Sequence, residues 1–165
     1  MAITPQQVVF ILISVLTLGC GLMVVLSRNL FHSALWLVGS FFGVAALYGL
    51  LEAEFLAVAQ ILIYIGAIAT LIVFATMLTR GMMLGRMKMS NFQSGVSAVV
   101  AVLLLGLLVM VLLQVNWPTE AVPVPGDTIA MIGNAFVSAY VIPFEVVSLL
   151  LLVALVGAIM IARER

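Results

Sequence analysis

The sequence predicts an all-α integral membrane protein with five transmembrane helices. Of its 165 residues, 66% are hydrophobic and only 7% are charged, whereas a soluble domain carries about 25% charged residues. Too few polar side chains are present to cover a surface that faces water. The long apolar runs lack the alternation of polar and apolar residues that is typical of strands in a membrane barrel. Helices are therefore the predicted spanning elements.

The first three predicted spans cover about residues 8–26, 30–51 and 55–78, and Arg28 and Glu52 separate them. Each span contains the roughly 20 mostly apolar residues that are needed to cross a bilayer as a helix. No charged residue lies inside any of these three spans. We therefore expect three closely spaced helices in the first half of the chain.

The fourth predicted span covers about residues 95–115 and the fifth about residues 140–162, which ends before Arg163. Pro143 is placed near the start of the fifth span, where proline is tolerated because a first-turn amide has no intrahelical partner. The segment between these spans, about residues 116–139, is the longest loop and is predicted to lie outside. All five spans together form a single predicted membrane domain over residues 1–165.

A short helix is predicted within this outer loop, after a first half that is rich in proline and therefore turn-like. Asp127 or Thr128 can cap its start, and the helix would cover residues 129–132. Gly133 and Asn134 are expected to end it.

Basic residues all fall on one side of the five-span pattern. They are Arg28, Arg80, Arg86, Lys88, Arg163 and Arg165. The loops on the other side contain four acidic residues and no basic ones. These are Glu52, Glu54, Glu120 and Asp127. The positive-inside rule therefore predicts an outside N-terminus and a cytoplasmic C-terminus. We expect a multi-pass protein in the lipid bilayer of a bacterial inner (plasma) membrane.

Several function classes are excluded by what the sequence contains. The formal net charge is zero, so the basic excess that binds nucleic acid is missing. The single cysteine, Cys20, and the single histidine, His32, cannot supply a four-thiolate iron–sulfur cluster or a bis-histidine haem. No span carries an ionisable residue at its centre, whereas proton relays usually depend on such groups. We predict no catalytic, cofactor-binding or metal-binding residue, and a role beside partners rather than as a stand-alone transporter.

Polar and small residues gather near the middle of the third span. Gln60 and Tyr64 are one helical turn apart, and Gly66 and Ala67 follow. Polar and small side chains can serve a helix–helix contact, in which backbones approach closely. A glycine with polar neighbours can also hold a π-bulge, which is often a functional feature of a mobile or hydrated segment. Both interpretations stay open on this pattern alone.

Two carboxylates are further candidates. Glu145 lies near the outer end of the fifth span, where it can pair with the positive end of the helix dipole or contribute to coupling. Glu54 precedes the third span on the outer side, where charges commonly belong to the loop.

The stretch over residues 53–68, AEFLAVAQILIYIGAI, and its continuation over residues 71–78, LIVFATML, resemble a known motif. It is the third helix of chain J of proton-pumping NADH–quinone oxidoreductase, respiratory complex I, whose mitochondrial counterpart is NADH dehydrogenase subunit 6. The resemblance extends to residues 29–35, NLFHSAL, and to residues 140–145, YVIPFE. It covers nearly the whole chain and is weakest in the first and fourth spans.

This resemblance implies five transmembrane helices in the membrane arm, beside chains A, H, K and an N-like subunit. It implies no cofactor in this chain, with NADH, FMN, iron–sulfur clusters and quinone in partner subunits. The third helix of the family can carry a π-bulge at the positions of Tyr64 and Gly66, and its conversion to regular helix accompanies the opening of a water-filled path. Gln60 is neutral where some relatives carry a carboxylate, so a protonatable role there is not expected.

The function that the resemblance implies is a non-catalytic complex I subunit that helps couple quinone reduction to proton translocation. The candidate coupling or gating residues are Gln60, Tyr64, Gly66, Ala67, Glu54 and Glu145. The alternatives are the equivalent subunit of a membrane-bound hydrogenase or of a multi-subunit sodium/proton antiporter, and a stand-alone small transporter.

Overall fold

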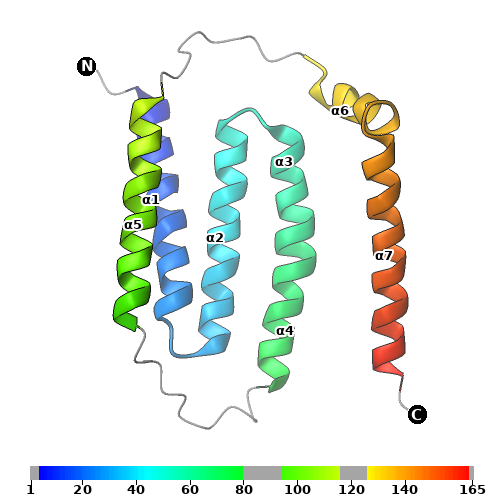
Figure 1. The fold of residues 1–165 in the computed structure, drawn as a ribbon, viewed down its shortest axis with the longest axis horizontal. Coiled ribbons are helices and arrows are strands. Elements are labelled where there is room, and N and C mark those ends of the chain that lie inside the picture. Colours follow the sequence, from blue (N-terminus) through cyan, green and yellow to red (C-terminus); the bar gives the residue numbers. More distant parts are fainter. Residues whose placement is uncertain (1–3, 80–93, 116–125, 164–165) are drawn as a thin grey trace. The chain divides into compact units, whose positions relative to one another are not determined.

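The computed structural model describes residues 4–79, 94–115 and 126–163, and the described residues are almost entirely helical (Figure 1). Within these residues, five helices are long and apolar enough to cross a membrane, which confirms the predicted number of spans. The elements are α1 Pro5–Leu26, α2 Leu30–Leu50, α3 Glu54–Ala59, the π-helix η1 Gln60–Ala69, α4 Thr70–Thr79, α5 Ser94–Gln114, α6 Thr128–Val137 and α7 Val141–Ala162. Several predicted loop charges lie outside the described residues, namely Arg80, Arg86, Lys88, Glu120 and Arg165.

The first helix begins three residues before its predicted start at residue 8. Thr4 and Gln7 form a capping box, in which the Thr4 hydroxyl accepts from the Gln7 amide and the Gln7 side chain accepts from the Thr4 amide. Pro5 occupies the first helical position, where a missing amide hydrogen costs nothing. Reciprocal capping satisfies two of the orphan amides, so the helix extends beyond the apolar run that marked it in the sequence.

Helices α1 and α2 form an antiparallel hairpin whose backbones approach closely. A side-chain carbon added to Gly43 would lie 2.8 Å from Thr17 Cβ and 3.1 Å from the Thr17 backbone. One turn away along α2, a carbon added to Gly39 would lie 3.0 Å from Cys20 Sγ. The Ser33 hydroxyl closes the other end by donating to the Val24 carbonyl at 2.6 Å. Small residues thus allow the close approach that stabilises helix pairs in lipid.

The turn from α2 to α3 is a Schellman motif. The Ala53 amide donates to the Tyr48 carbonyl at 3.0 Å, and the Glu52 amide donates to the Gly49 carbonyl at 3.2 Å. Glu52 has a φ of 57°, which is the left-handed conformation that this position requires and that glycine adopts most easily. The motif ends α2 and places Glu54 at the first position of α3.

The third span consists of α3, η1 and α4 in succession, and all three pack along α2. It covers 26 residues, Glu54–Thr79, whereas α2 has 21. A π-helix closes its hydrogen bonds over five residues instead of four, so each turn contains more residues and the helix rises less per residue. The π-helical middle therefore shortens the long third span toward the length of the neighbouring α2.

Residues Pro123–Arg165 form a second compact unit that contains α6 and α7. Asp127 caps α6 by accepting from the Ala130 amide at 3.1 Å, as predicted. Helix α6 continues to Val137, so the predicted stop at Gly133 and Asn134 is wrong. The centroid of the Phe136 ring lies 5.9 Å from that of the Phe144 ring of α7. This contact near the end of α6 favours a longer helix than Gly133 and Asn134 indicate.

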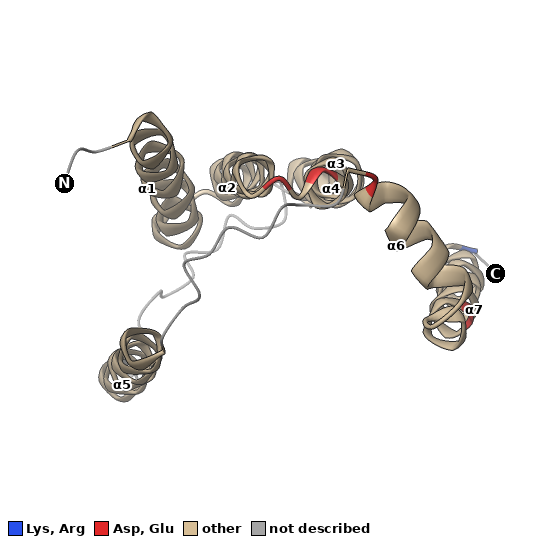
Figure 2. Cartoon of the chain, turned by 90° about the horizontal axis from the view of Figure 1, so that it is seen from above, with Lys and Arg blue, Asp and Glu red and all other residues tan. Residues whose placement is uncertain are grey.

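Apolar side chains cover the outside of α5 and α7. Every described side chain of α5 and nearly every one of α7 is exposed in this chain, although both helices are apolar enough to span a membrane. Large apolar surfaces of this kind are typical of contact with lipid or with other protein. Acidic residues lie at the α2–α3 connection and at the start of α6 (Figure 2), whereas Arg28 lies in the α1–α2 turn.

The close contact at Gly43 yields the first prediction. We expect Gly43→Ala to destabilise the α1–α2 hairpin by about 1–3 kcal/mol, because overpacking a fitted contact forces backbone or side-chain shifts. The measurement is the amount of SDS needed to unfold the purified chain in mild detergent. Gly49→Ala is the matched control, because an added carbon there meets nothing within 4 Å. Equal stability of the two variants would contradict a fitted contact at Gly43.

Candidate functional site

The candidate site is the π-helix η1 in the middle of the third span. It extends over ten residues, Gln60–Ala69, and contains Gln60, Tyr64, Gly66 and Ala67. Regular α-helix precedes it in α3 and follows it in α4. The structure thus has a π-helix at the place where the sequence pattern left a packing contact and a π-bulge as alternatives, and this π-helix is longer than a single-turn bulge.

Gln60 and Ala69, at the two ends of η1, are its buried residues. Only 7% of Gln60 and 1% of Ala69 is exposed. The two positions are nine residues apart, which is close to two turns of a π-helix at about 4.4 residues per turn. They therefore lie on the same face of η1, and this face packs against α2.

The Gln60 side chain is polar and buried, yet its amide makes no hydrogen bond with the residues that the structure describes. Neither of its amide atoms is fully enclosed and unpaired, so a small opening to the outside remains. A buried amide needs a partner at this depth of a membrane. A water molecule or a polar group of a neighbouring subunit is therefore required at this opening.

Tyr64 takes a different position from Gln60, although the sequence placed both on one polar stripe. Its ring lies against Phe41 of α2 in an edge-to-face arrangement, with centroids 5.5 Å apart and planes at 76°. The Tyr64 side chain is 44% exposed, and its hydroxyl makes no hydrogen bond with described residues. Phe41 was not predicted as a site residue, because a single phenylalanine in an apolar span carries no sequence signal.

Gly66 and Ala67 lie on the exposed side of η1. A side-chain carbon added to Gly66 would lie 3.4 Å from the Ile61 carbonyl oxygen, five residues earlier. This is an ordinary van der Waals distance, so an added side chain is sterically tolerated within the chain. Gly66 is therefore suited to η1 by its low preference for α-helix rather than by a crowded contact.

Thr70 marks the end of η1 and was not predicted from the sequence. Its hydroxyl donates to the Ile65 carbonyl oxygen at 3.1 Å. The bond crosses the junction between η1 and α4. A threonine in a transmembrane helix usually bonds its own helix, so sequence alone does not distinguish this one.

The two candidate carboxylates do not belong to η1. Glu54 is the first residue of α3, exposed, and six residues before Gln60. Glu145 is exposed in α7, and its backbone carbonyl accepts from the Ser148 hydroxyl at 2.7 Å. Neither carboxylate forms an ion pair with a described residue. Glu54 lies in the first turn of α3, which favours pairing with the helix dipole, whereas Glu145 is the fifth residue of α7 and lies beyond its first turn.

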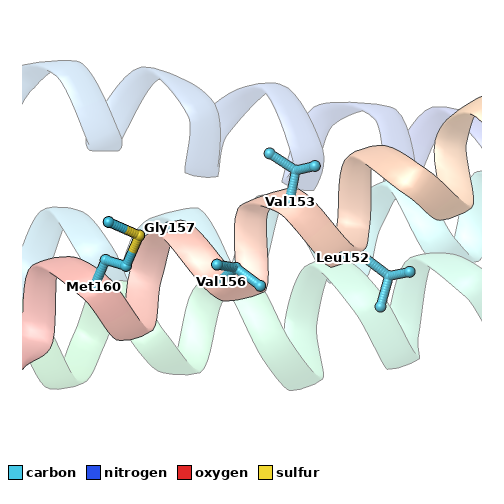
Figure 3. Close-up of a pocket in the computed structure, with 5 residues that line it drawn as sticks. All are labelled: Leu152, Val153, Val156, Gly157 and Met160. Atoms are coloured by element: carbon cyan, nitrogen blue, oxygen red, sulfur yellow. The ribbon is translucent and has the colours of Figure 1, made fainter.

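Residues able to hold a metal do not cluster in the described part of the chain. A shallow depression on α7 is lined by Leu152, Val153, Val156, Gly157 and Met160 (Figure 3). All of its lining side chains are apolar, so it offers no group for acid–base chemistry or for orienting a polar ligand.

One family model and several known proteins match most of this chain. Residues 20–161 match the family model described as NADH-ubiquinone/plastoquinone oxidoreductase chain 6. The chain is similar to NAD(P)H-quinone oxidoreductase chain 6 of Nostoc sp., with 38% identity over 96% of this chain and 80% of the relative. It is also similar to the chloroplastic NAD(P)H-quinone oxidoreductase subunit 6 of Mesostigma viride, with 38% identity over 96% and 85%. Subunit J of the F(420)H(2) dehydrogenase of Methanosarcina mazei is 36% identical over 96% and 91%.

The contact between Phe41 and Tyr64 yields the second prediction. We expect a double-mutant cycle of Phe41→Leu and Tyr64→Leu to give a coupling of about 0.5–1.5 kcal/mol, which is typical of edge-to-face aromatic pairs. The measurement is the free energy of unfolding of the purified chain in detergent. Phe42→Leu is the control, because Phe42 is 52% exposed and has no ring contact among the described residues. A coupling near zero for Phe41 and Tyr64 would contradict the prediction.

Proposed function

This chain belongs to the chain 6 family of NADH-ubiquinone/plastoquinone oxidoreductases, the membrane subunits of complex I, and we propose that it couples quinone reduction to proton translocation through a change in its third span. It is a subunit of an oxidoreductase complex and contributes no redox centre. The coupling element is η1, which converts between π-helix and α-helix. The observation that carries this proposal is the ten-residue π-helix at mid-span.

A change from π-helix to α-helix would have a large geometric effect. In the π-helix, Gln60 and Ala69 lie on one face. In an α-helix of 3.6 residues per turn, nine residues make about two and a half turns, so the same two residues would lie on opposite faces. One end of the third span must then rotate by nearly half a turn relative to the other. Such a rotation moves Gln60 or Ala69 away from α2 and changes which groups a neighbouring subunit meets.

The rotation needs a fixed neighbour, and the α1–α2 hairpin supplies it. The close approach at Gly43 and Gly39 holds α2 against α1. The Schellman turn fixes the start of α3 against the end of α2. We therefore propose that α3 stays in place and that α4 turns, since α3 is restrained by this short connection.

Proton carriage itself is assigned to other subunits. The central parts of the five spans contain no Asp, Glu, Lys, Arg or His, and such groups are what a membrane proton relay usually requires. Gln60 is neutral, so it can hydrogen-bond water but cannot store a proton at ordinary pH. We propose that the chain opens or closes a path and that its neighbours carry the protons.

The donor and the partners are part of the proposal. Relatives are named for two donors, NAD(P)H and F(420)H(2), so we propose a membrane role that does not depend on the donor. Flavin, iron–sulfur clusters and quinone would lie in partner subunits, and membrane subunits equivalent to chains A, H, K and N would contact the apolar surfaces of α5 and α7. We propose the plasma membrane as the location, with the basic side facing the cytoplasm.

Co-purification tests the proposed complex. We expect the tagged chain, extracted in mild detergent, to bring down flavin and iron–sulfur subunits together with other membrane subunits. Mass spectrometry and the visible absorption of flavin and iron–sulfur centres are the measurements. Antiporter subunits without a redox module, or a chain that purifies alone, would overturn the proposal.

Substitution of Gly66 tests the coupling role. We expect Gly66→Leu to lower the number of protons pumped per electron severalfold while assembly stays near normal, because leucine favours α-helix over glycine by about 1 kcal/mol. Proton uptake and quinone reduction are measured together in sealed vesicles. Gly19→Leu in α1 is the control, since an added carbon there meets nothing within 4 Å. Normal pumping by an assembled Gly66→Leu enzyme would exclude η1 as the coupling element.

A further inference from the structure

We propose that the hydroxyl of Thr70 is a latch that stabilises η1 in its π-helical form. The latch is the hydrogen bond from Thr70 Oγ1 to the Ile65 carbonyl oxygen, at 3.1 Å. It makes Thr70 a positioning residue, which acts through the backbone of the third span. The proposal deepens the coupling role described above and rests on it only for the functional consequence of the latch.

The spacing of this bond distinguishes it from the other hydroxyl bonds that stay within one described span; the Ser33 hydroxyl instead bonds across to α1. Thr17 and Thr79 each bond the carbonyl four residues earlier, and Thr76 bonds the carbonyl three residues earlier. Ser138 and Ser148 likewise span four and three residues. Among the described helical residues, Thr70 alone reaches back five.

The number of residues that the hydroxyl bond spans depends on whether the backbone is α-helical or π-helical. In an α-helix, a threonine hydroxyl reaches the carbonyl three or four residues earlier. For Thr70 these would be the carbonyls of Ala67 and Gly66. The carbonyl of Ile65, five residues earlier, would then lie one residue beyond this reach. The observed bond to Ile65 is therefore available in the π-helix and is lost, or exchanged for another, in the α-helix.

The surroundings of Thr70 increase the effect of this bond. Thr70 is exposed on the surface of the chain, within a helix long and apolar enough to span a membrane. In hydrocarbon, no water competes for its hydroxyl, so the hydroxyl must bond within its own helix or to a neighbouring subunit. The acceptor that it finds here is the carbonyl of Ile65 inside η1, so the bond joins the start of α4 to the π-helical segment.

Three single variants test the latch in the intact oxidoreductase complex, reconstituted into lipid nanodiscs. Thr70→Val removes the hydroxyl and keeps the shape, Thr70→Ser keeps the hydroxyl, and Thr76→Val removes a hydroxyl whose bond spans three residues in α4. Cryo-electron microscopy of each complex measures the ratio of particles with π-helical and α-helical third spans, under the same resting conditions without electron donor.

We expect Thr70→Val to shift the ratio of π-helix to α-helix toward α-helix by about twofold to fivefold. The upper value corresponds to a hydrogen bond of about 1 kcal/mol that the α-helix does not replace, and the lower value to a bond that it replaces in part. Thr70→Ser should keep the parent ratio, and Thr76→Val should leave it unchanged. If Thr70→Val does not assemble, Thr70→Cys replaces it, because a thiol is a weak donor and should give a smaller shift in the same direction.

The outcomes separate the latch from the coupling role. An unchanged ratio in Thr70→Val, or an equal shift in Thr76→Val, would overturn the latch and leave the coupling role standing. A lower π-helical fraction with an unchanged number of protons per electron would support the latch and contradict the coupling role. A lower fraction with lowered pumping, both restored in Thr70→Ser, is the result expected if both hold.

Discussion

The structure depends on one constraint, namely that each backbone polar group inside the hydrocarbon must be hydrogen-bonded within the protein. A spanning helix meets this constraint with bonds over four residues, and a π-helix meets it with bonds over five. The two forms therefore leave few backbone groups without a partner, and a segment can change between them within the membrane. Unwinding would expose several carbonyls to lipid, whereas a change of register keeps most of them paired.

This constraint explains the arrangement around the third span. Helix α2 needs a stable position, since η1 packs along it, and small residues at Gly39 and Gly43 let α1 hold it at short range. The aromatic contact from Phe41 to Tyr64 joins the same α2 to the middle of η1. Helix α2 thus packs by close backbone contact against α1 and by side-chain contact against η1. A change of register costs less free energy at the contact made by side chains.

Much of the fold could be predicted from the sequence, because charge and hydropathy alone mark the spans. The five helices, the cap at Asp127 and the position of the π-helix in the third span all follow from local patterns. The start of α1 at Pro5 was missed because the reciprocal cap of Thr4 and Gln7 lies before the apolar run. The extension of α6 past Gly133 was missed because it depends on Phe136 packing against Phe144, a contact between two helices.

The least predictable features are those that depend on backbone register. Polar and glycine residues indicate where a π-helix can form, yet its ten-residue length depends on which carbonyl each donor reaches. The same register decides that Gln60 shares a buried face with Ala69, while Tyr64, one turn from Gln60 in an α-helix, is 44% exposed. A stripe drawn with α-helical periodicity therefore groups the wrong residues.

The lack of ionisable residues at the centres of the spans can be interpreted together with the π-helical register of η1. A chain without ionisable groups at the centre of its spans cannot pass protons along its own side chains, but it can decide which neutral polar group a neighbouring subunit meets. In the proposed change, α3 and Gln60 stay against α2, and a rotation of about half a turn would move Ala69 away from α2. A polar group can bind water in a membrane and an alanine cannot, so in this proposal the Gln60 amide is the group that can hold a water molecule, and the rotation of α4 would change which residues lie near it without any change in charge.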